Sequence, residues 1–505
     1  MTKRILSLLL VVLMLSALVA CGGGDEVSSE KPGSNVASGS LQSTDTDTDT
    51  NTGTTSDRVQ PDVPLDEMSG KNFIIIQHGP IEDPFGYSQD SFAAELAAER
   101  ISEISNAWGC TISFEQVAYN DEFVSTMQAK QYSDNAGDLI FSSNNAQLRK
   151  ALGTGGDTSL MIDLLAMDDI VDFWNTDKWG NITSRETMMA GGTFYGLTPA
   201  LWYNCTPLPY YSVVYSKDLL ASFETENPQE LWEQEAWDRD AMLDIITSCY
   251  DDTMGEPIFG MSAHMTHMVR ASYLSAGVDA VVIDKINADG SVDWTYGMAD
   301  PLAVESLQWL KNSITANRKY FNNGADPSGS WTAHNAYVSG MSAMCLTAYR
   351  VVFDNIAMQC ENFALIPWAG ADANTLSGFY ENCYSVAIPI FAQDFDLSAH
   401  LMAHLFEGLG EVESSDDIVK YYKETYFESD LDVSFLLMEG ANLQYSYWPN
   451  GGDAALNTIA SGLMSASSVK TLVEKTVPTV SEVVETHLVP NAVALEKYRQ
   501  NGYFD

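Results

Sequence analysis

Lys71–Gln77 reads KNFIIIQ, a short run of apolar and β-branched residues that predicts a buried strand. A helix follows it, because four apolar residues recur with the spacing of one helix face: Ala97, Ile101, Ile104 and Trp108. Residues 111–117 and 138–141 predict two further strands, with a second helix over 121–130 between them. This alternation predicts an α/β fold, with a parallel sheet that carries helices on its faces.

The carboxyl ends of the first and third predicted strands are where a ligand site is expected, because ligands of parallel α/β sheets bind beyond those ends. The ends are His78-Gly79 and Ser142–Asn145. In the second half, Asp289-Gly290 predicts a hairpin turn and Asp300-Pro301 a helix start. Further strands are predicted at 212–215, 342–347 and 385–390, and the C-terminal part is predicted to be mostly helical.

The first twenty residues have the layout of a removable signal peptide. Lys3 and Arg4 precede an apolar run over 5–20, which is short for a membrane span of about 20 residues. Leu18-Val19-Ala20-Cys21 then resembles the bacterial lipobox, which implies lipidation of Cys21 and anchoring on the extracytoplasmic face of the cell membrane. The alternative is an ordinary secretory signal with a chance cysteine.

Residues 21–66 predict a disordered tether, because Ser, Thr, Asp and Gly dominate and there is almost nothing to bury. The Asp-Thr alternation from Asp45 does not fit a calcium-binding EF-hand loop, because its sixth position is Thr50 and not glycine. The segment is therefore interpreted as a solvated spacer.

The composition limits the partners of the remaining body. The chain carries 69 acidic and 25 basic residues, a formal net charge of -44. Such a surface repels nucleic acid and anionic lipid headgroups, so no nucleic-acid partner is expected. Six cysteines follow Cys21 without any CxxC spacing, which removes the usual redox and zinc motifs. Disulfides and buried free thiols both remain open.

Six short segments then occur in a characteristic order: Gly137–Ile140 (GDLI), Tyr195–Thr198 (YGLT), Val214–Leu219 (VYSKDL), Leu274–Val278 (LSAGV), Gly340–Met344 (GMSAM) and Tyr384–Pro389 (YSVAIP). Together they resemble the family 1 extracellular solute-binding proteins, the maltose-binding-protein-like receptors of carbohydrate ABC importers. The resemblance covers most of residues 70–440. It implies a two-lobed periplasmic-binding-protein-like (type II) α/β fold with crossover strands and a cleft between the lobes.

The resemblance also implies a division of the chain and a mechanism. Lobe one is expected at 70–209 plus 386–440, and lobe two at 210–385 plus 441–505. The strand at Val214 should lead into lobe two, and the strand at Tyr384 should lead back. A sugar or oligosaccharide would close the lobes and be delivered to ABC permease subunits, with the receptor acting as a monomer without a cofactor. The stretch 198–211 is longer than the family pattern, and the tail after 414 does not match it.

The candidate ligand-binding residues follow from these positions and from sugar chemistry. Aromatic rings cover the flat faces of a sugar, whereas amides, carboxylates and arginine pair with its hydroxyls. The candidates are Tyr349, Arg350, Asn144, Asn145, Trp202, Trp331, His267, His78, Asp83 and Tyr380. For each of them the alternative is a role in packing.

Other functions fit the sequence less well. His264 with His267, and His400 with His404, have spacings that a metal site could use, but Leu401 stands where HExxH has its glutamate. We therefore expect no metal site. A secreted glycoside hydrolase would need paired carboxylates in a cleft, and no catalytic motif marks such a pair, so we expect a receptor and not an enzyme. A non-sugar solute such as a peptide or polyamine remains the alternative ligand.

Overall fold

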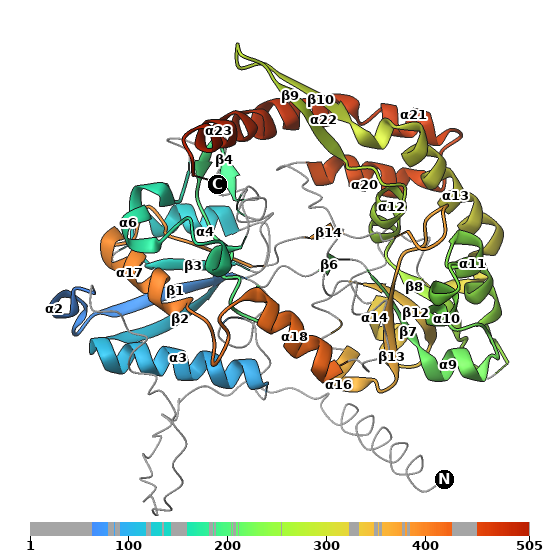
Figure 1. Ribbon diagram of the computed structural model, residues 1–505, viewed down its shortest axis with the longest axis horizontal. Coiled ribbons are helices and arrows are strands. Elements are labelled where there is room, and N and C mark those ends of the chain that lie inside the picture. Colours follow the sequence, from blue (N-terminus) through green and yellow to red (C-terminus); the bar gives the residue numbers. More distant parts are fainter. Residues whose placement is uncertain are drawn as a thin grey trace, which may run out of the picture. The chain divides into compact units, whose positions relative to one another are not determined.

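The structure is a computed structural model of the 505-residue chain. It describes residues 63–78, 85, 91–117, 123–133, 136–142, 159–180, 185, 188–203, 205, 209–210, 212–253, 255–322, 333–347, 352, 356–375, 379–380, 384–426 and 452–503. The predicted signal peptide, Cys21 and nearly all of the tether lie outside this range. Two open sheets organise the described part (Figure 1).

The first sheet has the strand order β15-β3-β1-β2 and confirms the predicted parallel α/β sheet. Strands β1 (Asn72–His78), β2 (Thr111–Val117) and β3 (Leu139–Ser142) run parallel, and β15 (Ser385–Ala387) is antiparallel to β3. Helices α3 (Phe92–Trp108) and α4 (Phe123–Lys130) connect the parallel strands. We call this sheet and the elements packed around it lobe one.

Gly137 and Asp138 explain how β3 docks beside β1. The Ile74 backbone N–H donates to Oδ2 of Asp138 at 2.7 Å. Gly137 has φ +135°, and a Cβ there would lie 2.6 Å from Cδ1 of Ile76, so a side chain does not fit. Gly137 and Asp138 therefore hold β3 beside β1, because the glycine allows a close approach and the aspartate provides a buried hydrogen-bond acceptor.

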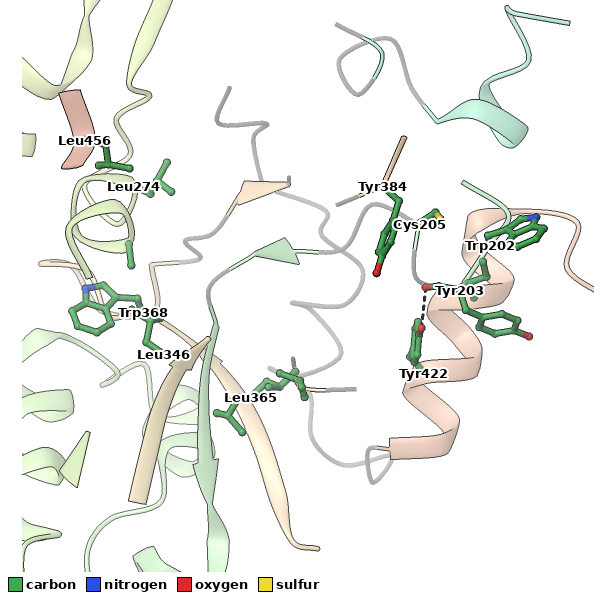
Figure 2. Packing of buried hydrophobic residues seen from close by; sticks show 14 of the residues in the cluster. Trp202, Tyr203, Cys205, Leu274, Leu346, Leu365, Trp368, Tyr384, Tyr422 and Leu456 are labelled. Atoms are coloured by element: carbon green, nitrogen blue, oxygen red, sulfur yellow. Dashed lines mark hydrogen bonds between the residues drawn. The ribbon is translucent and has the colours of Figure 1, made fainter. Parts of the chain in front are cut away.

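Lobe one is completed by segments from the middle and the end of the chain. A short hairpin, β4 (Met189–Ala190) and β5 (Thr193–Phe194), joins the core through Leu197, which bridges to Val386 of β15. Short helices η4 (Leu164–Met167), α6 (Asp168–Val171) and α7 (Thr176–Trp179) precede this hairpin. Helices α17 (Phe395–Leu405) and α18 (Ser415–Tyr426) come later, and the Tyr422 hydroxyl of α18 donates to the Tyr203 carbonyl at 2.9 Å (Figure 2).

The second sheet, which defines lobe two, has the order β11-β8-β12-β7-β13. Its strands are β7 (Ser212–Ser216), β8 (Phe259–Ala263), β11 (Phe321–Asn322), β12 (Ser342–Thr347) and β13 (Phe363–Pro367). Strand β7 is antiparallel to both of its neighbours, whereas β8 is parallel to β11 and β12. The predicted strands at 212–215 and 342–347 are thereby confirmed.

Helices surround the second sheet: α9 (Lys217–Ser222), α10 (Pro228–Glu233), α11 (Arg239–Ser248), α12 (Met265–Leu274), α13 (Pro301–Asn317) and α14 (Ala333–Val338). Helix α13 begins as predicted, because Oδ1 of Asp300 accepts from the Leu302 N–H at 2.8 Å. The predicted turn at Asp289-Gly290 joins β9 (Val281–Ile286) to β10 (Val292–Tyr296), and Gly290 has φ +85°.

The two sheets are linked by a very short antiparallel pair of strands. Strand β6 (Pro209–Tyr210) leads into β7, and β14 (Phe379–Tyr380) leads towards β15. These two strands pair with each other. The predicted crossover strands at Val214 and Tyr384 therefore belong to the sheets or lie just before them, and the link between the lobes lies upstream of each.

The C-terminal segment is helical, as expected. It comprises α20 (Gly452–Leu463), α21 (Val469–Glu474), α22 (Val477–Val483), a π-helical turn η8 (Val484–Leu488) and α23 (Val489–Gln500). Helix α20 packs on α12 of lobe two, whereas α23 contacts β4 of lobe one. No helix in the described part of the chain is long and apolar enough to cross a membrane.

Four cysteines of the described part are free thiols, namely Cys110, Cys249, Cys345 and Cys360. Cys110, Cys205, Cys249 and Cys345 are buried, and Cys360 is half-buried. Burial raises the pKa of Cys249 and of Cys345 to about 12, so both thiols stay protonated at neutral pH. Of the two alternatives left open by the sequence, free thiols hold for Cys110, Cys249, Cys345 and Cys360, while Cys383 lies outside the described range.

Asp138 provides a test of how lobe one is assembled. Burial raises the pKa of its carboxyl, against the hydrogen bond from Ile74 and the charge of Lys71. A raised folded-state pKa means that this group's contribution to stability is present at low pH and is lost as the pH rises through the folded pKa. Asp138→Ala removes the acceptor and should cost about 1–3 kcal/mol of unfolding free energy at pH 7. Asp138→Asn keeps an oxygen acceptor without a charge and should cost less.

Urea unfolding at pH 7 measures both variants, with Asp66→Ala in the exposed part of α2 (Leu65–Met68) as the matched control. Equal losses in Asp138→Asn and Asp138→Ala would show that the charge, and not the acceptor, is what the fold requires.

Candidate ligand-binding site

Strand register defines the edge of the first sheet at which a ligand site is predicted. His78 ends β1 opposite Val117 of β2 and Ser142 of β3, and Ser142 is in turn opposite Ser385 at the start of β15. Three carboxyl ends and one strand start therefore lie together, with the Ser142 and Ser385 side chains fully buried. This is the edge at which the predicted residues of lobe one were placed.

The segment after β1 is tied back to the sheet by Gln77. Oε1 of the buried Gln77 accepts from the Phe85 N–H at 2.9 Å. The Phe85 ring is fully buried, with edge-to-face contacts to the Phe141 and Trp202 rings at centroid distances of 5.1 and 4.6 Å. Phe85 has φ +61°, a left-handed backbone conformation that is uncommon for a residue with a side chain. Asp83 precedes this anchor and lies outside the described residues.

The second sheet has a corresponding edge. Ser212 at the start of β7 is opposite both Thr347 at the end of β12 and Pro367 at the end of β13. On the other side of β12, strands β8 and β11 end at Ala263 and Asn322. The polar side chains here are uncharged: the hydroxyls of Ser212 and Thr347 are buried, and the amide of Asn322 is half-buried.

Two histidines follow the end of β8 at this edge. His264 caps α12 with Nδ1, which accepts from the Thr266 N–H at 3.3 Å, and it is half-buried. His267, one turn later, is only 7% exposed, and its ring centroid lies 5.3 Å from that of His264. Burial, together with His264 and Arg270, lowers the pKa of His267 well below its usual range. The ring of His267 is therefore neutral at pH 7, and His264 is the more accessible of the two.

Trp202 lies in the core of lobe one. Its side chain is fully buried (Figure 2), and its indole N–H donates to the Glu407 carbonyl at 3.0 Å. Its ring is tilted against Phe406 at a centroid distance of 5.0 Å. The structure thus shows that Trp202 packs in the core of lobe one. Contact with a ligand stays a prediction.

Most other predicted site residues are positioned only through the strands beside them. Tyr349 and Arg350 follow the end of β12 at Thr347, and Asn144 and Asn145 follow the end of β3 at Ser142. These four residues, Trp331 and Asp83 lie outside the described residues. For His78 and Tyr380 only the backbone is described: His78 ends β1, and Tyr380 pairs with Pro209 in the link.

The pair His400 and His404 belongs to the packing of α17. The rings stack at a centroid distance of 6.3 Å, and His404 meets the Trp108 indole edge-to-face at 5.6 Å. Nearby, Nζ of the buried Lys178 pairs with Oε1 of Glu407 at 2.5 Å. Among the described residues no three His, Cys, Asp or Glu side chains are grouped as a metal site would require.

Comparison of the whole fold with solved structures gives consistent matches. The first is an ABC substrate-binding protein of Listeria monocytogenes in complex with cycloalternan, with a TM-score of 0.55, 13% identity, and 83% of this chain and 99% of that chain covered. The chain has the fold of ABC solute-binding proteins. No protein-family model matches the sequence, and no relative is found among curated proteins.

Other solute-binding proteins agree in extent. The maltose/maltodextrin-binding domain of Bdellovibrio bacteriovorus, bound to maltotriose, matches with a TM-score of 0.53, 13% identity, and 82% and 100% coverage of this chain and that one. A solute-binding protein of Thermotoga lettingae, bound with α-D-tagatose, gives 0.51, 13%, 84% and 100%. The solute-binding fold thus accounts for the two sheets, as the six sequence segments predicted.

His404 should make lobe one sensitive to acid. Burial and the nearby Lys178 lower its pKa to about 4, with Glu407 opposing and with His400 and Arg100 adding to the effect. An unfolded histidine takes up its proton near pH 6.5, so stability should fall as the pH drops from about 6.5 towards 4. His404→Gln should lose less stability over this window than the unmodified chain. Urea midpoints at pH 7 and pH 5 measure the difference, and equal losses in both proteins would exclude His404 as the cause.

Proposed function

We propose that the chain is the extracytoplasmic solute-binding receptor of an ABC importer. It captures a sugar or oligosaccharide between its two lobes, closes around it by bending at the β6–β14 link, and delivers it to membrane permease subunits. The ligand shifts an equilibrium between open and closed forms, because it contacts both sheet edges only in the closed form. The receptor acts as a monomer and performs no chemistry on its ligand.

The observation that carries this proposal is where the chain enters each sheet. From β6 the chain passes into lobe two at Ser212, which lies on the edge where β12 and β13 end. From β14 it returns into lobe one at Ser385, which lies on the edge where β3 ends. The link therefore adjoins both edges, and bending a two-residue ladder is enough to change their separation.

The chemistry of the edges supports a neutral, hydroxyl-rich ligand. The described polar side chains there are uncharged. Asn322 is half-buried, whereas Ser142, Ser385, Ser212 and Thr347 are buried within the edges. The predicted aromatic and amide residues in the segments that follow would add stacking surfaces and further donors. The net charge of -44 disfavours a strongly anionic ligand.

Attachment to the membrane is proposed to occur through lipid on Cys21, with residues 22–66 as spacer. Cells that express the chain and are fed an alkyne-tagged fatty acid should label the unmodified protein, and Cys21→Ser should abolish the label because the acyl acceptor is removed. The variant should also leave the membrane fraction, since about 0.8 kcal/mol per buried methylene is lost with the chains. Equal labelling of both proteins would exclude Cys21 as the anchor.

Ligand capture is tested by thermal unfolding of the purified chain with maltotriose, cyclic and linear glucans and tagatose, and with peptides and spermidine as controls. A ligand at a hundred times its Kd stabilises the folded state by about 2.7 kcal/mol, so the melting temperature should rise with one glycan class. Tyr349→Ala and Arg350→Ala should each weaken that binding about tenfold or more, which corresponds to about 1.4 kcal/mol.

Trp179→Phe, which changes a buried residue that is not a ligand-binding candidate, is the matched control for these two variants. It leaves the Val171 carbonyl without the indole donor and should lower stability by about 1–3 kcal/mol, while the shift induced by the ligand stays unchanged. Loss of the shift in Trp179→Phe would show that general loss of stability explains the effect of the Tyr349 and Arg350 variants. A shift with a peptide or spermidine but with no sugar would overturn the carbohydrate assignment, and turnover of a glycoside would overturn the receptor.

A further inference from the structure

Helix α23 contacts both lobes. It lies against β4 of lobe one and also against β9 in the hairpin of lobe two (Figure 1). The polypeptide thereby connects the lobes again about 110 residues after the β14 strand of the link. The two contacts differ in kind, and this difference decides which lobe the helix follows.

On the side of lobe one, the contact is specific. Asn491 is fully buried; its Oδ1 accepts from the Gly192 N–H at 3.1 Å, and its Nδ2 donates to the Met189 carbonyl at 3.2 Å. Both partners belong to the β4–β5 hairpin. A Cβ at Gly192 would lie 2.9 Å from Cβ of Ala494, so the helix and the hairpin are already in close contact. A buried amide with both of its groups used in this way fixes the position of the helix.

Aromatic rings extend this contact along the helix. Tyr498 approaches Trp174 and Phe194 at centroid distances of 5.9 and 5.8 Å. Tyr503, just beyond the helix, stacks on Trp174 at 4.8 Å with an interplanar angle of 22°. Lobe one therefore holds α23 from its first turn to beyond its last.

On the side of lobe two, the strand that α23 contacts is partly exposed, while the helices before α23 are hydrogen-bonded to lobe two. No residue of β9, the strand that it contacts, is buried. In contrast, the Thr476 hydroxyl at the start of α22 is hydrogen-bonded to the buried Tyr296 hydroxyl of lobe two at 2.8 Å, and Lys311 of α13 donates to the Ala466 carbonyl. Between the firm contacts of the two lobes lies the π-helical turn η8, a kind of irregularity that often marks functional positions in helices.

We propose that α23 moves with lobe one and acts as a strap, a segment that joins the lobes and limits how far they separate. When the lobes move, the backbone changes at η8 and at the contact with β9. The hydrogen bonds of Asn491 hold the helix on lobe one and so set the limit of separation. The proposal rests on the hinge motion described above and not on the identity of the ligand. A strap with one end on each lobe excludes the arrangements in which the lobes are farthest apart. The chain then loses less conformational entropy when the lobes close. Asn491 is thus a positioning residue that strengthens ligand binding from a site away from the sheet edges.

The test is the distance between the lobes in the ligand-free chain, measured by single-molecule fluorescence transfer. Dyes are attached through azide-bearing residues at the exposed positions Ser102 on α3 and Asp244 on α11, because the chain has cysteines of its own. Asn491→Ala releases the strap and should broaden the distribution towards longer distances. Gly192→Ala should act in the same direction by pushing the hairpin off Ala494, and it decides the matter if Asn491→Ala does not fold.

Two control variants separate the strap from general destabilisation. Lys497→Ala changes an exposed residue of the same helix, and Ile104→Ala opens a cavity in the core of lobe one away from α23; both should keep the original distribution. Unchanged distances in folded Asn491→Ala and Gly192→Ala would overturn the strap, even if both variants melt at lower temperature. With maltotriose as probe, a working strap also predicts a Kd at least about threefold higher in Asn491→Ala. If maltotriose fails to bind the unmodified chain, only the choice of this sugar as probe is at fault, and the distances still decide on the strap.

Discussion

The pairing of β6 with β14 is the constraint on which the arrangement of the protein depends. Phe379 and Tyr380 lie opposite Tyr210 and Pro209, so the outgoing and returning connections between the sheets run side by side. For both connections to start and end at this point, the chain must enter each sheet at the edge nearest the link. Strands β7 and β15 accordingly run against their neighbours, while the strands around them end at the same edges. The link and the sheet edges beside it are thus positioned by one requirement.

Much of the fold could be predicted because its signals are local. The runs around Ile75 and Ile112 carry enough apolar and β-branched residues to predict β1 and β2, and Thr111–Val117 is predicted to the residue. Asp300 and Gly290 mark a helix start and a hairpin turn through interactions within a few residues of themselves. Such elements depend little on the rest of the chain, so their positions are visible in the sequence.

The candidate site was less predictable, because burial of a side chain depends on distant segments. Trp202 has an aromatic side chain that could stack on a sugar. The sequence does not show that Phe406 and Glu407, some 200 residues later, pack against it. His267 was selected by position, whereas packing of α12 buries it and leaves His264 more accessible. The double contact of α23 could not be predicted either, since Asn491 resembles any polar residue until its two backbone partners are known.

The returning strand β15 has a consequence for the order in which the protein can be completed. Ser142 is paired with Ser385, about 240 residues further along the chain, whereas all strands of the second sheet lie between Ser212 and Pro367. A chain that emerges N-terminus first can therefore finish the middle sheet while the first sheet still lacks a strand. Sequence-distant pairings form slowly because a long loop must close first. The first lobe to emerge is thus the last to be finished, and its unfinished edge stays open until nearly four-fifths of the chain has emerged.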